Sequence, residues 1–446
     1  MIPLAVTGAT PLSIEVELED RLADAAVVEG VELALERGPV RLGRCRFVAD
    51  GGAARDTVGR LVPLDDACDC RRLVEDGNYV ELRNFFHNVS IVVAQREKIR
   101  PDFKEYCANL VYDLAVYKRL FDEQDAIIAA EPPGVAEAAR DALIASEGRG
   151  FFAFLDAKLH ELEDLVRGFT KEEHERHGFY LRRQIWPYIL SSAFLKRTNL
   201  RPRGYAGDAE TMCLLYENGY AGATVFEKLL HKHQMEADAA KAVRNRRAII
   251  ASGLREVAAR FPATPPHGFA FMSLASGPAW ELRDVYLQPE DFQRFRCTLL
   301  DQDPHALALA QELIAKVERE RGGRIAATFL SESVRTMIRT RDMAQRFGRF
   351  QYIYSMGLFD YLTPPVAKAV LARVFELLVP GGTIVVGNYH ARSTTRVYMD
   401  YWVDWPLYYR TEDTLRELAD GLPARSVRIT EDATRCQMFL HVERGP

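Results

Sequence analysis

Residues 271–281 have the sequence FMSLASGPAWE, an apolar run that breaks into a turn of small residues. Residues 299–303, LLDQD, form a second apolar run that ends in an acid, Asp301. A strand, a tight turn, a helix and a second strand tipped by a carboxylate make up the nucleoside-binding half of a doubly wound sheet. The turn lets the backbone approach the ligand, and the carboxylate accepts hydrogen bonds from ribose hydroxyls. The pattern therefore predicts a nucleoside site at the end of these strands.

The whole C-terminal block, residues 263–446, alternates strands and helices in this way. We expect strands at 270–274, 297–300, 326–330, 350–355 and 383–387, and a closing hairpin from 425–430 and 437–442. A helix is expected from Pro364 to Leu378, between Thr363 and the stop signal Pro380-Gly381-Gly382. Repeats of this length indicate a parallel sheet covered by helices on both faces.

The first block, residues 1–76, alternates apolar and polar residues at 13–18, 40–48 and 58–62. This alternation predicts a small antiparallel β domain. The spacing of Arg41, Arg44 and Arg46 suits either a phosphate site or a solvated strand face, and a solvated face is the commoner outcome for charge runs. No motif assigns this block a ligand.

The middle block, residues 77–262, keeps helical spacing of its apolar residues and breaks at Pro132-Pro133-Gly134. Residues 201–208, RPRGYAGD, form a compact loop with a proline, two glycines and an acid. Asp208 is placed to cap the helix that follows. The loop is either an ordinary helix–helix connection or a backbone that bends around a ligand.

Composition limits the class of protein. The chain has 446 residues, of which 48% are hydrophobic and 27% charged, and a net charge of -5. These values are typical of a globular protein of two or three domains and argue against a nucleic-acid partner. We expect no signal peptide and no integral membrane segment.

Seven cysteines are scattered along the chain: Cys45, Cys68, Cys70, Cys107, Cys213, Cys297 and Cys436. Only Cys68 and Cys70 lie close together, so we expect reduced thiols in a cytoplasmic protein and no metal site.

The turn at 275–279 contains one glycine, whereas a dinucleotide fold usually carries three in a G-x-G-x-x-G pattern. A ligand without a pyrophosphate relaxes that requirement, and S-adenosylmethionine is such a ligand. It needs room for its aminocarboxypropyl arm, an acid for its ribose and a slot for adenine. The sequence therefore favours a methyl donor over a nicotinamide cofactor.

The C-terminal block resembles the class I S-adenosylmethionine-dependent methyltransferases over its whole length. Residues 274–279 stand where that family has its glycine-rich motif, 300–304 where it has the acidic end of strand two, and 378–384 where it turns into strand five. The chain departs from the family at Ser273 and Ala275, where an acid and a glycine are frequent. The expected architecture is α/β, with a doubly wound, Rossmann-like methyltransferase domain after a helical region and a small N-terminal β domain.

A narrower similarity is carried by residues 203–208, RGYAGD, and 354–362, YSMGLFDYL. They resemble bacterial methyltransferases of the hydroxy-fatty-acid methyl ester synthase type. This resemblance implies a small-molecule substrate that is methylated on a carboxylate oxygen. We also expect the helical block to supply a lid that carries residues 203–208.

The strand ends supply the expected cofactor-binding residues. Asp301 is expected to accept the ribose hydroxyls, whereas Asp303, followed by Pro304, is placed to cap the next helix. The full expected set is Ala275, Ser276, Gly277, Asp301, Gln302, Ser333, Ser355, Met356 and Gly357.

The residues expected to act on the substrate come from the lid loop and from the ends of strands four and five. Methyl transfer is an in-line displacement that needs the nucleophile held against the methyl group, and aromatic faces favour a cationic sulfonium. Asp360 is equally suited to face the substrate or to cap the helix after Thr363. The aromatic run 398–405 suits a substrate site, but aromatic residues at helical spacing more often belong to a packed core. The expected catalytic residues are Tyr205, Asp208, Asp360 and His390, and the expected substrate-binding residues are Arg203, Phe359, Asn388, Tyr389, Tyr401 and Trp405.

The nature of the acceptor separates two enzymatic hypotheses. A carboxylate is already ionised and needs donors such as Arg203, Tyr205 or His390 to place it. An amine must lose a proton and needs carboxylates, which Asp208, Asp360, Asp400 and Asp404 offer. We expect a cytoplasmic methyltransferase of a hydroxy fatty acid first, and of an amino acid, guanidine or other amine second. A protein that holds the cofactor without catalysis is a third hypothesis, and a homodimer is left open.

Overall fold

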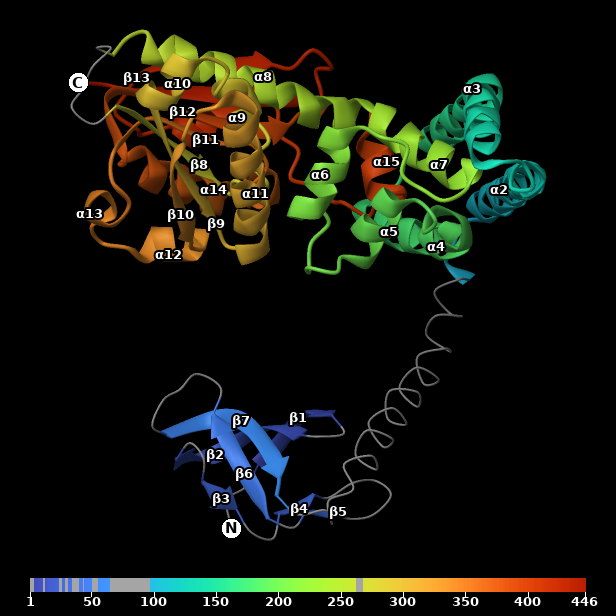
Figure 1. Ribbon diagram of the computed structural model, residues 1–446, viewed down its shortest axis with the longest axis horizontal. Coiled ribbons are helices and arrows are strands. Elements are labelled where there is room, and N and C mark those ends of the chain that lie inside the picture. Colours follow the sequence, from blue (N-terminus) through green and yellow to red (C-terminus); the bar gives the residue numbers. More distant parts are fainter. Residues whose placement is uncertain are drawn as a thin grey trace. The chain divides into compact units, whose positions relative to one another are not determined.

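The computed structural model describes residues 4–10, 13–23, 26–28, 31–33, 40–42, 44–49, 55–64, 97–261 and 268–446. The chain forms two compact units, Met1–Ile99 and Arg100–Pro446, and the second contains both the helical and the alternating block (Figure 1). The domain boundaries expected at residues 76 and 262 fall outside the described residues and stay predictions. Cys68 and Cys70 also lie outside them, whereas the five described cysteines are free thiols.

The N-terminal unit consists of short antiparallel strands. One sheet contains, in order, β1 (Leu4–Thr10), β2 (Ser13–Ala23), β7 (Arg55–Pro63), β6 (Cys45–Ala49) and β3 (Val27–Val28), and a separate pair contains β4 (Val31–Leu33) and β5 (Val40–Leu42). Val16, Phe47 and Leu61 are buried in the larger sheet. The small β unit is confirmed, but the single strand expected at 40–48 is wrong. Its first half pairs with β4 and its second with β7, and alternation of residue types alone does not select a partner.

The helical block begins the second unit. It contains α2 (Pro101–Ile128), α3 (Pro133–Val166), α4 (Lys171–Ile189), α5 (Ala193–Leu200), α6 (Ala209–Glu217), α7 (Val225–Glu236) and α8 (Asp238–Ala258). Proline in the first turn starts α2 and α3, and the capping boxes of Thr170 and Thr224 start α4 and α7. Asp208 caps α6 as expected, because its carboxylate accepts a bond from the Thr211 amide at 2.8 Å.

The C-terminal block is built on a sheet of seven strands. Its order is β10 (Ala326–Ser331), β9 (Phe295–Asp301), β8 (Phe269–Leu274), β11 (Phe350–Ser355), β12 (Leu378–Tyr389), β14 (Gln437–Arg444) and β13 (Ala424–Glu431). The first five are parallel, and β14 runs antiparallel between β12 and β13. The expected parallel sheet with a closing hairpin is therefore confirmed. The order reverses between β8 and β11, which is where open sheets of this kind bind ligands.

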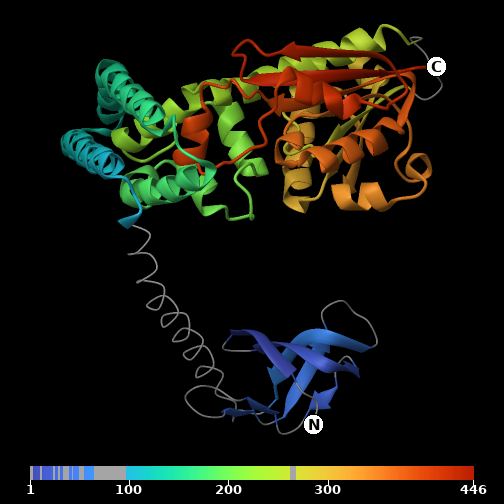
Figure 2. The ribbon, with the colours of Figure 1, turned by 180° about the vertical axis from the view of Figure 1, so that it is seen from behind.

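Helices cover both faces of this sheet, as the two opposite views show (Figures 1 and 2). One face packs against α8, α9 (Leu282–Val285), α10 (Pro289–Arg294) and α11 (Pro304–Arg321), and the other against α12 (Val334–Arg339), α13 (Met343–Phe347), α14 (Pro364–Phe375) and α16 (Glu412–Arg416). Since β8, β11 and β12 lie between two apolar layers, they contain nearly continuous runs of buried residues. Two expected boundaries are wrong, because α14 ends at Phe375 instead of Leu378 and β12 begins at Leu378 instead of residue 383.

The chain returns to the helical block after β12. The short helix α15 (Arg396–Tyr401) packs against α4 and α3, so that the red segment lies among green helices in Figure 1. Tyr401 anchors it, because its hydroxyl lies 2.9 Å from His174 Nδ1 and its ring 6.2 Å from that of Phe103. This return makes the helical block and the sheet one unit. Among the helices described, none combines the length and apolar character that crossing a bilayer requires.

Candidate functional site

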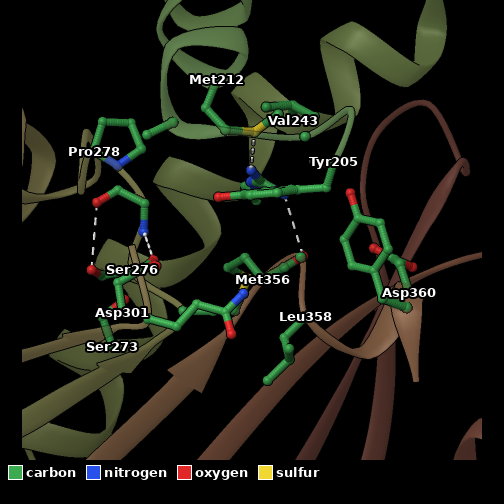
Figure 3. A pocket seen from close by; sticks show the side chains of 18 of the residues that line it. Tyr205, Met212, Val243, Ser273, Ser276, Pro278, Asp301, Met356, Leu358 and Asp360 are labelled. Atoms are coloured by element: carbon green, nitrogen blue, oxygen red, sulfur yellow. Dashed lines mark hydrogen bonds between the residues drawn. The ribbon is translucent and has the colours of Figure 1, made fainter. Parts of the chain in front are cut away.

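A cavity of about 510 Å³ opens at the carboxyl ends of β8, β9 and β11. Its walls come from the turn after β8, from Asp301 at the end of β9, and from Met356 and Gly357 after β11. Residues of the helical block, including Tyr205, Met212 and Val243, close the opposite side, as Figure 3 shows for the labelled side chains. The helical block therefore contributes directly to the site at the strand ends.

The turn after β8 brings its backbone toward the cavity. Ala275, Gly277 and Ala279 adopt φ of 53°, 54° and 52°, in the left-handed region. The Ser276 amide donates to the Leu300 carbonyl at 3.1 Å, and the Gly277 amide donates to Asp301 Oδ2 at 2.8 Å. Ala275 thus keeps a conformation that a glycine would adopt without strain. The alanine therefore makes this turn less stable than a glycine would.

Asp301 is fixed at the mouth of the cavity. Its Oδ2 accepts from Gly277 and its Oδ1 accepts from the Asp303 amide at 2.9 Å, while the side chain is 7% exposed. Burial raises the pKa of this carboxyl, and the two backbone bonds oppose the rise. Each carboxylate oxygen has a second lone pair, so Asp301 can accept further bonds from a ligand hydroxyl.

The loop at 201–208 bends over this part of the cavity. Arg203 pairs with Asp303 through two contacts, and Nε lies 2.6 Å from Oδ2. Asp303 also caps α11, as expected, by accepting from the His305 amide at 3.0 Å. The ring of Tyr205 extends across the cavity (Figure 3). Gly207 has no room for a side chain, because a Cβ would collide with the ring of Trp405.

Asp360 lies at the other end of the cavity. The side chain is 2% exposed, and Oδ1 accepts from the Tyr389 amide at 2.7 Å. Burial raises its pKa to about 7, and the Tyr389 bond with the positive charges of Arg246 and Arg410 limits the rise. A carboxyl with this pKa exchanges a proton near neutral pH, which suits a general acid or base. Asp360 therefore faces the cavity, and the cap position of α14 is taken by Thr363.

Two buried charged residues of the cavity were not expected from the sequence. Arg246 on α8 is 7% exposed and Glu281 is 4% exposed, and both line the cavity. Glu281 Oε1 accepts from the Tyr354 hydroxyl at 2.7 Å. Helical periodicity places Arg246 among apolar residues such as Val243 and Ile250, and a charge on a buried helical face was the signal that could have found it.

The cavity brings together twelve of the residues expected at the site: Arg203, Tyr205, Ala275, Ser276, Gly277, Asp301, Gln302, Met356, Gly357, Asp360, Tyr389 and Trp405. Seven others do not line it: Asp208, Ser333, Ser355, Phe359, Asn388, His390 and Tyr401. Asp208 pairs with Arg197 at 2.7 Å, Ser333 caps α12, and the Ser355 hydroxyl donates to the Leu274 carbonyl at 2.9 Å. Phe359 is fully buried in the apolar core below β11 and β12. Asp208, Ser333, Ser355 and Phe359 therefore all make structural contacts. The roles predicted for the residues that line the cavity and for those that do not remain predictions.

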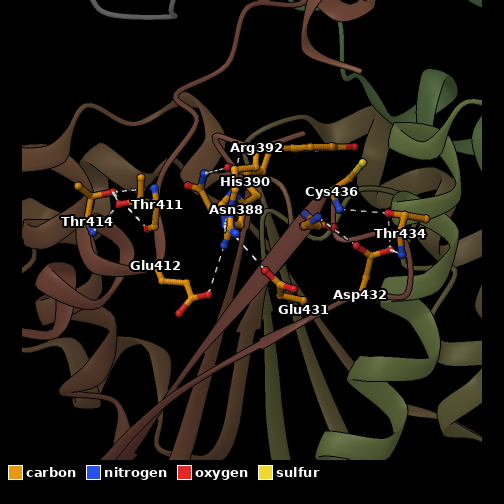
Figure 4. A network of polar contacts seen from close by, with 12 residues as sticks. Asn388, His390, Arg392, Thr411, Glu412, Thr414, Glu431, Asp432, Thr434 and Cys436 are labelled. Carbon is orange, nitrogen blue, oxygen red and sulfur yellow. Dashed lines mark hydrogen bonds and ion pairs between the residues drawn. The ribbon is translucent and has the colours of Figure 1, made fainter. Parts of the chain in front are cut away.

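His390 and Asn388 belong to a separate polar network (Figure 4). The Arg392 amide donates to His390 Nδ1 at 2.8 Å, and Arg392 Nη2 lies 3.1 Å from Nε2. Glu431 Oε1 lies 3.8 Å from the same Nε2. The side chains of His390, Glu412 and Glu431 have the spacing of a metal site. The guanidinium of Arg392, however, already supplies a positive charge beside Glu412.

Comparison with known proteins gives distant structural matches alone. No family model and no curated protein matches the chain. A "possible exported protein" from Bordetella parapertussis is 19% identical with a TM-score of 0.45, and covers 67% of this chain and 97% of its own. An O-methyltransferase family protein from Burkholderia thailandensis is 14% identical with a TM-score of 0.37, and covers 79% of this chain and 98% of its own. Magnesium protoporphyrin IX methyltransferase from Synechocystis, with bound S-adenosylmethionine, is 11% identical with a TM-score of 0.32, and covers 46% of this chain and 83% of its own.

None of these three is described as a hydroxy-fatty-acid methyl ester synthase, so the narrower resemblance stays a prediction. The order and directions of the strands carry the conclusion about the fold. Five parallel strands in the order β10-β9-β8-β11-β12 are extended by an antiparallel β14 and a final β13. The C-terminal block of this chain therefore has a doubly wound, Rossmann-like fold.

Proposed function

We propose that the protein is an S-adenosylmethionine-dependent methyltransferase that acts on a small molecule. The observation that carries the proposal is the cavity at the β8–β11 switch point, in which Asp301 and the turn after β8 share a wall. A carboxylate held by two backbone amides, with lone pairs left over, fits the two hydroxyls of a ribose. The apolar residues of the same cavity fit the rest of an adenosyl ligand, and no pyrophosphate-binding glycine pattern is needed.

The residues of this chain would hold the cofactor from three sides. Asp301 would accept the ribose hydroxyls, Gln302 would contact adenine, and Met356 with Gly357 would line the sulfur end. When bound, the cofactor supplies an electrophilic methyl group on a sulfonium. The protein then has to exclude water and hold the acceptor in line with the methyl group, which is chiefly a matter of positioning. The Tyr205 ring provides an aromatic face over the cavity, which favours a cation.

The first candidate acceptor is the carboxylate of a hydroxy fatty acid. The apolar wall of the cavity, which includes Met212, Val243, Leu358 and Leu407, suits an alkyl chain. A carboxylate acceptor needs no base, and Arg203 and Tyr205 offer donors at the edge of the cavity.

The second candidate acceptor is an amine, and Asp360 favours it. A protonated amine cannot attack a methyl group, so the site must hold its charge and remove a proton. Asp360 lies in the cavity with a pKa of about 7 and can accept that proton near neutral pH. The bond from Tyr389 leaves the second oxygen of the carboxyl without a hydrogen-bond partner within the described chain.

A methyl-transfer assay tests the proposal. The purified full chain is incubated with S-adenosylmethionine that carries a radiolabelled methyl group and with a panel of hydroxy fatty acids and amines. Label recovered as a base-labile ester supports the carboxylate acceptor, and base-stable label on nitrogen supports the amine. Cofactor that binds without transferring label to any member of the panel would favour the hypothesis of a non-catalytic cofactor-binding protein.

A further inference from the structure

The indole of Trp405 closes the end of the cavity that lies away from Asp301. Figure 3 shows Asp301 at one end of the cavity and Asp360 at the other. The segment that carries Trp405 lies against the second end, because the Tyr408 amide donates to the Asp360 carbonyl at 2.8 Å. Trp405 lines the cavity and is 8% exposed, and its Nε1 donates to the Tyr361 hydroxyl at 2.7 Å. The indole and the phenol therefore form one wall.

The loop at 201–208 rests on this wall. A Cβ built on Gly207 would collide with the indole of Trp405 and with the hydroxyl of Tyr361, so the backbone of the loop touches both rings. The loop has no room to come closer to the wall, and the wall has no room to move toward the loop. The position of the indole therefore determines how much space remains at this end of the cavity.

Asp404 holds the indole from behind the wall. Its φ of 52° lies in the left-handed region, which aspartate tolerates better than most residues. Its Oδ1 lies 3.1 Å from Arg182 Nη2 on α4, and its Oδ2 lies 2.8 Å from Arg201 Nη2 at the start of the loop. The next amide, that of Trp405, donates to the Met399 carbonyl at 2.9 Å. One carboxylate thus fixes the turn before the indole to both α4 and the loop.

We propose that Trp405 sets the size of the largest apolar acceptor that the cavity admits, and that Asp404 is the positioning residue that holds the indole in place. The inference rests on the proposed function, because the acceptor is expected at the end of the cavity away from Asp301. It concerns the apolar part of the acceptor and applies to a carboxylate and an amine alike. Asp404 does not line the cavity, so it acts on the acceptor through Trp405.

Calorimetric titration with chains of increasing length tests the role of Trp405. The probes are octanoate, dodecanoate and hexadecanoate with the matching alkylamines, below the concentrations at which they form micelles, and the full chain is used with and without S-adenosylhomocysteine. We expect Trp405→Leu to raise the ratio of long-chain to short-chain affinity at least tenfold, since one methylene group in an apolar pocket is worth about 10–200-fold. Trp186→Leu is the matched control, because Trp186 Nε1 donates to Asn199 Oδ1 at 3.2 Å on the helices and does not line the cavity.

A double-variant cycle tests the role of Asp404. Asp404→Asn keeps the shape of the side chain and its tolerance of a left-handed backbone, and it loses the charge that pairs with the two arginines. We expect this variant to raise the same ratio of affinities at least threefold in the wild-type background and to change it less than twofold in Trp405→Leu. An acid with a merely structural role would give the same change in both backgrounds, and that result would overturn the role of Asp404.

Two further measurements separate the failure of this inference from the failure of the proposed function. If wild type binds S-adenosylhomocysteine and transfers label, but Trp405→Leu leaves the ratio of affinities unchanged, the inference is overturned and the proposed function stands. If wild type neither binds S-adenosylhomocysteine nor transfers label, the proposed function fails, whereas a shifted ratio still supports the size limit. Binding of no chain by wild type overturns the inference. Trp405→Phe, which keeps a ring and loses the bond to Tyr361, replaces Trp405→Leu if that variant does not fold by far-ultraviolet circular dichroism.

Discussion

Replacing Asp360 with asparagine should stabilise the protein at neutral and alkaline pH. In the folded chain, burial raises the pKa of Asp360 from its ordinary 3.8 to about 7. Between these two pH values the folded state holds a proton that the unfolded state has released, so stability falls as pH rises through this window. At 1.36 kcal/mol per pH unit, the full penalty above pH 7 is about 4 kcal/mol. The asparagine side chain would keep an acceptor for the Tyr389 amide and would never carry a charge.

The assay is chemical unfolding of wild type and Asp360→Asn at several pH values between 4 and 9. Tryptophan fluorescence follows the second unit alone, because all four tryptophans lie between residues 186 and 405. We expect a difference near zero at pH 4 that grows to a few kcal/mol at pH 8, in favour of the variant. Asp420→Asn, at an exposed position, should show no such trend. A difference that does not depend on pH, or a variant less stable at pH 8, would refute the argument about burial.

Two further substitutions test the turn and the lid loop. Ala275→Gly should raise the free energy of unfolding by about 0.5–1 kcal/mol, measured by chemical unfolding. Relief of the backbone strain of a left-handed alanine gains about 1–2 kcal/mol, and the greater freedom of the unfolded chain costs about 0.4–1 kcal/mol. A variant less stable than wild type would contradict the strain at Ala275. Gly207→Ala should destabilise the unit by about 1–3 kcal/mol and weaken cofactor binding, because its methyl group meets Trp405 and Tyr361. Gly219→Ala, where no atom lies within 4 Å of the new methyl group, is the control, and equal effects of the two alanines would count against the close packing of the loop.

The sequence predicted the sheet because its strands are apolar runs bounded by clear turn signals. The run 271–274 is followed by small residues and the run 297–300 by an acid, and both are buried strands in the structure. Caps were predictable for the same local reason, since Asp208 and Asp303 each precede a helix and accept from its first turn. Local signals of this kind do not depend on the rest of the fold.

Long-range placement was harder to predict. Tyr401 and Trp405 belong to one aromatic run. Tyr401 nevertheless packs against α4 and Trp405 lines the cavity, because the run extends from the helices to the cavity. His390 follows β12 and still belongs to a network away from the cavity. Arg246 was missed because a helical repeat shows which residues share a face and does not show what that face meets.

The measurement that tests the account most directly is calorimetric titration of S-adenosylhomocysteine into the wild-type chain and into Asp301→Ala. Asp301 would bind the ribose hydroxyls, and bonds to a charged group contribute about 1.5–3 kcal/mol, so the variant should bind at least tenfold more weakly. Asp284→Ala, which removes a surface partner of Arg247, should bind like wild type. Binding by wild type that is lost or weakened in Asp301→Ala alone is the predicted result. No binding by wild type, or equal affinity of all three proteins, would contradict the placement of the cofactor at the ends of β8 and β9.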